Sequence, residues 1–301
     1  MSNTLSRALT DSLGELFGAT PRDIRRVGGG DISQAARVTL GSQIILVKWH
    51  SQPPQPREGW LEMFEAEARG LQLLASTGTL RVPRVLGHGG KQSDRPAFIV
   101  MSWIERGSGQ RGDAGAALGR GLSAMHRVSG KRYGLDHGNY CGATPQDNAW
   151  CDSWIEFYGR RRLGFQMELA GQRGRMPRQR RQRLERLIAN LDGWIDESQC
   201  QPSVLHGDLW GGNWMIDTAG EPVLIDPAVY YGEREAELGM CHLFGGFPSQ
   251  FFQAYDEAWP PAPGRDERIS LYKLYHVLNH LNLFGEGYGS QVDDILRRYV
   301  S

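Results

Sequence analysis

The stretch that decides the fold is HGDLWGGN, residues 206–213, which follows the apolar segment 203–205. Asp208 and Asn213 stand five positions apart within it. A phosphoryl-transfer site needs a carboxylate near the acceptor hydroxyl and oxygen ligands for Mg²⁺, and an Asp and an Asn in one loop can supply both. The alternative is a glycine-rich turn in which the two side chains only stabilise the backbone. The spacing favours a catalytic site over such a turn, with Asp208 as the catalytic residue and Asn213 as a metal ligand.

A second carboxylate, Asp226, follows Asn213 by thirteen residues and ends the apolar run 223–225. In protein kinases a catalytic loop, a short hairpin and an Asp at a strand end follow one another in this order, and that Asp is the principal metal ligand. Asp-Pro at 226–227 can also simply start a turn. The spacing to Asn213 favours a metal ligand at Asp226.

Lys48 lies in the apolar run IILVKW, residues 44–49. A buried lysine needs a partner, and both ATP phosphates and a carboxylate of the helix predicted at 60–76 would satisfy it. That helix offers Glu62, Glu65 and Glu67. We choose Glu67 as the partner, with Glu65 as the second choice. The competing interpretation of Lys48 is an edge-strand lysine that blocks aggregation.

Two backbone segments complete the predicted nucleotide site. The turn Gly28, Gly29 and Gly30 comes before strands expected at 35–40 and 43–49, and its amides could cover phosphates. Glycine triplets are common in turns, so this signal is weak by itself. Residues 99–103 would form the hinge that binds adenine, with Met101 and Trp103 as its contacts.

The distribution of strands and helices predicts the fold class. The first hundred residues are mostly strand with one inserted helix, and the remainder is mostly helix with short apolar strands. We therefore expect an α+β, protein-kinase-like fold of two lobes. Residues 1–103 would be the N-terminal lobe, an antiparallel sheet and helix that bind ATP. Residues 104–301 would be the C-terminal lobe, with the catalytic loop and the metal and acceptor sites.

Arginines crowd the stretch 160–186, which we interpret as a solvated helix pair with Glu156, Glu168 and Glu185 as partners. The alternative is a contact with an anionic substrate or partner. His276 and His280, one helical turn apart, could bind a metal, but a packed helix face is the favoured interpretation.

Composition narrows the class of partner. The 34 basic and 34 acidic residues cancel, which gives no support for nucleic acid or a membrane surface as a partner. No stretch approaches the roughly 18 apolar residues of a membrane span.

The first 17 residues carry charges and read as an amphipathic helix rather than a secretory signal. The four scattered cysteines suggest neither a disulfide framework nor a zinc site, so we expect reduced thiols in a cytoplasmic protein. The oligomeric state is open, with a monomer as the expectation.

Several motifs resemble the fructosamine kinase family (ketosamine 3-kinases), whose relatives include aminoglycoside and choline kinases. The similarity extends over most of the chain. It rests on VLHGDLWGGN at 204–213, GATPQDN at 142–148, WIEFY at 154–158, DPAVYYGERE at 226–235, LYKLYH at 271–276 and NHLN at 279–282. Trp210 and the 226–235 stretch are the most specific parts. Many relatives have a cysteine after the glycines where Asp31 stands here, so redox control at that position is not expected.

The resemblance implies ATP and Mg²⁺ between two lobes and phosphorylation of the 3-hydroxyl of a sugar joined to an amine. Such an acceptor would be fructosyl- or ribulosyl-lysine, as a small molecule or on a peptide or protein. The phosphorylated adduct would then decompose and regenerate the amine, which is protein deglycation. Trp210 would stack against the sugar–amine, although ordinary packing is equally compatible with it. An aminoglycoside, choline-like or plain sugar acceptor is the alternative, and a non-catalytic binding module is disfavoured because every catalytic position is filled.

Overall fold

A five-stranded antiparallel sheet forms the N-terminal part of the computed structural model, which describes residues 4–28, 33–57, 60–92 and 95–300. The strands lie in the order β1-β2-β3-β5-β4. Their bounds are β1 Pro21–Val27, β2 Gln34–Leu40, β3 Gln43–His50, β4 Val85–Gly89 and β5 Ala97–Ser102. A turn at Gly41 and Ser42 joins β2 to β3, with Gly41 at a φ of 58°.

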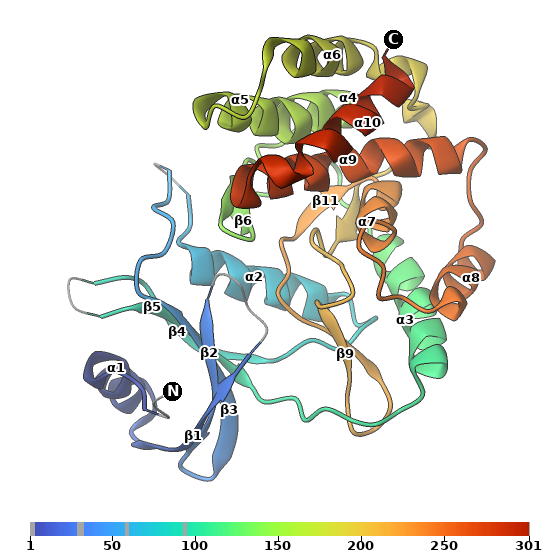
Figure 1. Cartoon of the computed structure of the whole chain (residues 1–301). Helices are drawn as coiled ribbons and strands as arrows, with labels where there is room; N and C mark the ends of the chain where they lie inside the picture. Colours follow the sequence, from blue (N-terminus) through green and yellow to red (C-terminus); the bar gives the residue numbers. More distant parts are fainter. Residues whose placement is uncertain (1–3, 29–32, 58–59, 93–94, 301) are drawn as a thin grey trace.

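Helices cover both faces of this sheet. Because side chains alternate along a strand, β5 contributes to two clusters. Phe98 and Val100 pack with Leu9 of α1 (Arg7–Phe17), whereas Ile99 and Met101 pack with α2 (Met63–Ser76). The α2 helix therefore lies between the sheet and the rest of the molecule, where it can present a carboxylate to β3 (Figure 1).

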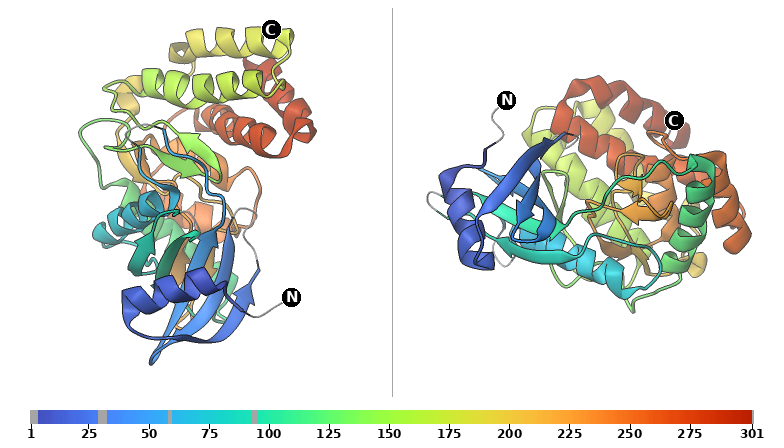
Figure 2. Two further views of the ribbon diagram at one scale, coloured as in Figure 1. Left: turned by 90° about the vertical axis from the view of Figure 1, so that its left-hand side faces the viewer. Right: turned by 90° about the horizontal axis from the view of Figure 1, so that it is seen from below.

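The remainder of the chain is mainly helical and stacks on the sheet at the α2 side, as Figures 1 and 2 show. Its α-helices are α3 Arg111–His126, α4 Trp154–Glu156, α5 Phe165–Gln172, α6 Arg178–Ala189, α7 Arg234–Cys241, α8 Ser249–Ala258, α9 Arg265–Phe284 and α10 Gly289–Tyr299. A π-helix, Phe157–Gly164, joins α4 to α5, and 3-10 turns lie at Leu191–Gly193, Glu197–Gln199 and Glu286–Tyr288. This distribution confirms the predicted α+β class.

Three short antiparallel strand pairs run through the helical part. They are β6 (Asn139–Cys141) with β7 (Thr144–Gln146), β8 (Ser203–Leu205) with β11 (Tyr230–Gly232), and β9 (Trp214–Ile216) with β10 (Pro222–Leu224). The β9–β10 hairpin also bonds the N-terminal part, because the Leu224 amide donates to the Arg81 carbonyl at 2.9 Å. On the hairpin's other strand, the Gly107 amide donates to the Ile216 carbonyl at 2.9 Å. The division of the chain at residue 103 stays a prediction.

The arginine-rich stretch is only partly solvated, so the prediction made for it is wrong in part. Arg160 and Arg181 do form the expected surface ion pairs. Arg162 and Arg180, however, are buried. The Arg162 guanidinium lies 4.0 Å from the Tyr230 ring centroid and donates to acceptors in the 147–148 segment. A buried guanidinium is tolerated where hydrogen bonds and an aromatic face replace its water.

Candidate active site

The loop 206–213 leaves β8 and ends where β9 begins. Gly207 has a φ of 84°, and a Cβ there would lie 2.0 Å from the Ala228 carbonyl oxygen. Only glycine fits such a position without a shift of the backbone. The Ala228 amide donates to the His206 carbonyl at 2.8 Å. The loop is thus held against the segment that follows Asp226.

Asp208 and Asn213 meet inside this loop. Asn213 Nδ2 donates to the Asp208 carbonyl at 2.8 Å and to its Oδ2 at 3.4 Å, with a longer contact of 3.5 Å to the Asp226 carbonyl. Since the amide nitrogen is engaged in this way, Asn213 Oδ1 is the side-chain atom that could bind a metal ion. The carboxylate and the amide oxygen therefore occupy one small region, as the sequence predicted.

Lys48 links this region to the sheet. Its Nζ lies 2.7 Å from Glu67 Oε1 of α2 and 3.0 Å from Asp226 Oδ1. Glu65 and Glu62 have other partners on the surface of the protein. The structure therefore brings together Lys48, Glu67 and Asp226, three residues that come from β3, α2 and the end of the β9–β10 hairpin.

Electrostatics hold Lys48 in its charged form. Burial alone would lower the pKa of Lys48, but the charges of Asp226 and Glu67 outweigh burial and raise it. Asp226 also adopts a φ of 55°, the left-handed region that a residue other than glycine rarely occupies. Such backbone conformations concentrate at functional sites, where the surrounding structure holds them in place.

Asp208 has the perturbed acidity of a proton acceptor. Burial is the main cause that raises its pKa, to about 8, and the negative charge of Asp226 adds to the rise. Hydrogen bonds from the Cys141 thiol and from Asn213 act in the opposite direction. A general base works best when its pKa lies near the operating pH, so this environment suits the role predicted for Asp208.

A buried carboxylate that sequence reasoning missed positions the loop. Glu237 of α7 accepts hydrogen bonds from the His206 amide at 2.6 Å and the Gly207 amide at 2.8 Å. His126 Nε2 lies 3.3 Å from the same carboxylate. Burial alone would raise the pKa of Glu237, but these hydrogen bonds lower it. In the sequence Glu237 stands between Ala236 and Leu238, which gives only a weak signal for a buried carboxylate.

The structure describes only some of the residues predicted to bind the nucleotide. Gly28 follows β1 and is exposed, whereas Gly29 and Gly30 lie outside the described residues. Met101 is buried in β5 and paired with β3. The Trp103 amide makes a long hydrogen bond of 3.4 Å to the Ile44 carbonyl. Adenine binding through that amide requires this bond to open.

Trp210 lies on the outside of its own loop. Its side chain is 38% exposed, and its ring lies over Gly212, where a Cβ would come within 2.4 Å of the indole. The ring therefore packs on the loop and is also open to a ligand, and its substrate role stays a prediction.

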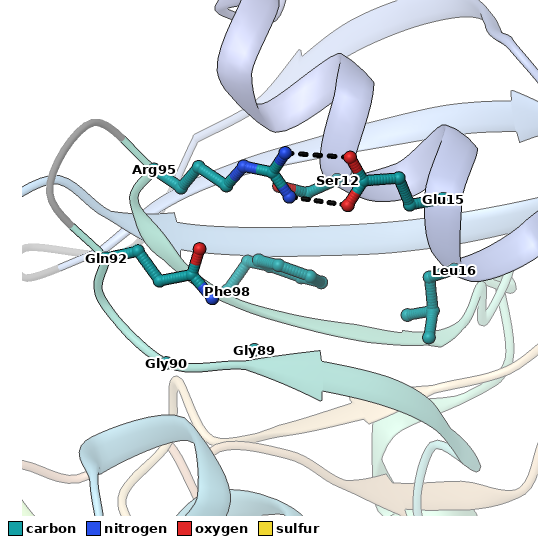
Figure 3. Close-up of a pocket in the computed structure, with 8 residues that line it drawn as sticks. All are labelled: Ser12, Glu15, Leu16, Gly89, Gly90, Gln92, Arg95 and Phe98. Carbon is teal, nitrogen blue, oxygen red and sulfur yellow. Dashed lines mark hydrogen bonds and ion pairs between the residues drawn. The ribbon is translucent and has the colours of Figure 1, made fainter.

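A surface hollow lies elsewhere, between α1 and the end of β4. Figure 3 shows Arg95 and Glu15 facing each other across it, with nitrogen–oxygen distances of 2.5 and 2.7 Å. Its lining contains none of the predicted site residues that the structure describes. Lys48, Glu67 and Asp226 bring their charges together elsewhere, and the pKa values of Lys48 and Asp208 are raised there, so we place the candidate active site in the Lys48–Asp226 region.

The fold is the protein-kinase-like fold, which the chain shares with solved phosphotransferase structures. The chain resembles the crystal structure of a thermostable mutant of an aminoglycoside phosphotransferase in ternary complex with AMP-PNP and hygromycin B. The TM-score is 0.65 at 15% identity, covering 96% of this chain and 98% of that chain. At this identity the likeness shows the fold alone.

The chain belongs to the fructosamine kinase family, whose model matches residues 1–301. It is 40% identical over 297 residues to a probable ketoamine kinase of Synechocystis sp., covering 98% of this chain and 95% of the relative. It is 43% identical over 282 residues to a chloroplastic protein-ribulosamine 3-kinase of Oryza sativa subsp. japonica, covering 92% of this chain and 78% of the relative. No helix among the described residues is long and apolar enough to cross a membrane.

Proposed function

We propose that this chain transfers the γ-phosphoryl group of ATP to the 3-hydroxyl of ketosamines. The observation that carries the proposal is the position of Lys48 Nζ, within 3.0 Å of both Glu67 and Asp226. Asn213, which donates to Asp208, also contacts the Asp226 carbonyl at 3.5 Å. Family membership and the names of the two relatives support fructosyl- and ribulosyl-amines as acceptors, including adducts of lysine on peptides or proteins.

Each residue of the cluster has a role in this proposal. Asp208 orients the sugar hydroxyl and accepts its proton. Lys48, braced by Glu67, binds the α- and β-phosphates. Positioning and charge neutralisation supply most of the rate enhancement in phosphoryl transfer, so the cluster needs no strong base.

The oxygen donors of Asn213 and Asp226 fit Mg²⁺, a hard cation that takes carboxylate and amide oxygens. Asn213 presents Oδ1 because its nitrogen is bonded within the loop, and Asp226 presents a carboxylate at the end of the hairpin. Mg²⁺, when bound there, neutralises phosphate charge. The Lys48 ammonium lies 3.0 Å from the Asp226 carboxylate.

The nucleotide is the remaining part of the proposal. The turn that begins at Gly28 would cover the phosphates, and the backbone from Met101 to Trp103 would bind adenine. AMP-PNP in the aminoglycoside phosphotransferase complex supports the binding of a nucleoside triphosphate in a site of this fold. A role in protein deglycation, a cytoplasmic location and a monomeric state stay predictions.

An acceptor screen tests the proposal. Purified protein is incubated with ATP and Mg²⁺ and a panel of fructosyl-lysine, ribulosyl-lysine, an aminoglycoside, choline and plain sugars, and ADP release is measured. We expect turnover with the two ketosamines. Turnover confined to another alcohol would refute the acceptor class, and the loss of turnover in Asp208→Asn would support the role of the aspartate.

A further inference from the structure

Three potential metal ligands of different chemistry meet at the loop 206–213. One ligand atom each from Cys141, Asp208 and His276 lies within 4.8 Å of the other two. They come from β6, the loop and α9, so the sequence could not bring them together. We call these three residues the thiol cluster. Cys141 and His276 are buried, and Asp208 is half-buried, which leaves one side of the cluster open.

His276 is the independent sign that the thiol cluster takes a ligand. Its Nδ1 is buried and has no hydrogen-bond partner among the described residues. Buried polar atoms are nearly always hydrogen-bonded, and an exception calls for an explanation. Burial, together with the nearby His280 and Arg162, lowers the pKa of His276 to about 3, so its ring is neutral, the form that binds metals.

The cysteine is held in a fixed position. Asn279, one turn along α9 from His276, donates from Nδ2 to the Cys141 carbonyl at 3.3 Å and to its sulfur at 3.4 Å. The thiol in turn donates to the Asp208 carboxylate. A fixed thiol, a carboxylate and an imidazole are the ligand types of protein zinc sites.

We propose that Cys141, Asp208 and His276 form a site for a thiophilic divalent cation, with Zn²⁺ as the ion that fits best. Binding releases the thiol proton and, at a pH below about 8, also the carboxyl proton of Asp208, so the ion carries one thiolate, one carboxylate and one neutral imidazole. These charges cancel those of the ion, which favours the complex in a buried place. Zn²⁺ takes four ligands, and the partly exposed Asp208 leaves the cluster accessible to the ion from the surface.

The occupied site switches off phosphoryl transfer, a consequence that rests on the proposed function. An Asp208 carboxylate bound to Zn²⁺ no longer accepts the proton of the sugar hydroxyl. Mg²⁺ does not occupy this site in place of Zn²⁺, because Mg²⁺ prefers oxygen ligands in octahedral geometry and binds thiolate and imidazole poorly. The site is thus separate from the proposed magnesium ligands Asn213 and Asp226, although Asp208 touches Asn213.

The binding arm of the test needs no turnover. The full-length protein is titrated with Co²⁺, whose absorption shows a thiolate-to-cobalt charge-transfer band, and with Zn²⁺ against a chromophoric chelator. We expect one ion per chain and a charge-transfer band in the wild type. Cys141→Ser should remove the band, and Cys141→Ser and His276→Gln should each weaken Zn²⁺ binding by roughly tenfold or more, since even outer-shell changes can cost that much.

Matched variants separate the thiol cluster from adventitious binding. Cys200→Ser removes another thiol, and His280→Gln removes the neighbouring histidine of α9, whose Nδ1 is bonded to the His276 carbonyl at 2.8 Å. Both controls should bind as the wild type does. The proposal is overturned if the wild type shows no charge-transfer band, or if the controls weaken binding as much as the cluster variants. Should Cys141→Ser fail to fold, the charge-transfer band of the wild type and the Zn²⁺ binding of Asp208→Asn still test the proposal.

The activity arm tests the switch. Saturating Zn²⁺ in the presence of excess Mg²⁺ should lower ketosamine turnover by about tenfold or more, and a chelator should restore it. Unchanged turnover with the site occupied would overturn the switch. Failure of the proposed function would appear differently, as absent ketosamine turnover before any Zn²⁺ is added, and it would leave the binding arm intact.

Discussion

Glu237→Gln is the substitution that most sharply tests how the loop 206–213 is positioned. The Glu237 carboxylate accepts from the His206 and Gly207 amides at 2.6 and 2.8 Å and lies 3.3 Å from His126 Nε2. Glutamine has nearly the same shape, keeps one acceptor oxygen and replaces the other with an amide donor. One backbone amide of the loop would then face a donor instead of an acceptor.

The size of the effect follows from these contacts. A hydrogen bond to a charged group contributes about 1.5–3 kcal/mol, and a buried donor left without an acceptor costs about 1–3 kcal/mol more. We therefore expect Glu237→Gln to lower the free energy of unfolding by roughly 3 kcal/mol. A displacement of Asp208 on the order of 1 Å would lower kcat by about a hundredfold.

The assay pairs urea unfolding with steady-state kinetics and uses Glu235→Gln as a control. Glu235 is also buried in α7, but it pairs with Arg268 at 2.7 and 2.9 Å and not with the loop. We expect both variants to lose stability and only Glu237→Gln to lose kcat. The reasoning is refuted if kcat of Glu237→Gln stays within about twofold of wild type, or if the control loses as much kcat.

Three further outcomes are expected. Gly207→Ala should destabilise the protein by about 3 kcal/mol or more in thermal unfolding, because its Cβ would meet the Ala228 carbonyl at 2.0 Å and its φ is 84°. Lys48→Met should lower kcat/KM for ATP by about a hundredfold to a thousandfold, since Asp226 and the phosphates lose their cation. Because the pKa of His276 is lowered from 6.5 to about 3, the unfolded chain binds a proton that the folded chain excludes in this interval. This group therefore lowers the free energy of unfolding as pH falls below 6.5, by up to about 1.4 kcal/mol per pH unit. In urea unfolding, the free energy of unfolding of His276→Gln should change less between pH 7 and pH 5 than that of the wild type.

The site could be predicted from the sequence wherever its residues lie close to one another in the chain. Asp208, Asn213 and Asp226 fall within one loop and one hairpin, so their meeting follows from local structure. Glu67 could be chosen over its neighbours because one face of an amphipathic helix must point to the sheet that holds Lys48. The structure brings these residues into contact.

Contacts between distant elements could not be predicted in this way. Cys141 reaches Asp208 only because the β6–β7 hairpin folds back beside α9, and no periodicity encodes that approach. Glu237 looks in the sequence like an ordinary acidic position of a helix, yet tertiary packing buries it under the loop. Arg162 reads as a solvated charge, whereas the π-helix that carries it turns it inward onto Tyr230.

The position of phosphate on the product tests the central claim most directly. Wild-type protein and Asp208→Asn are each given ATP, Mg²⁺ and fructosyl- or ribulosyl-lysine, and the product is analysed by NMR. We predict that the wild type places phosphate on the 3-oxygen of the sugar and that Asp208→Asn forms it slower by about a hundredfold or more. Phosphate on another oxygen, no product, or an unaffected rate in Asp208→Asn would contradict the proposed ketosamine 3-kinase.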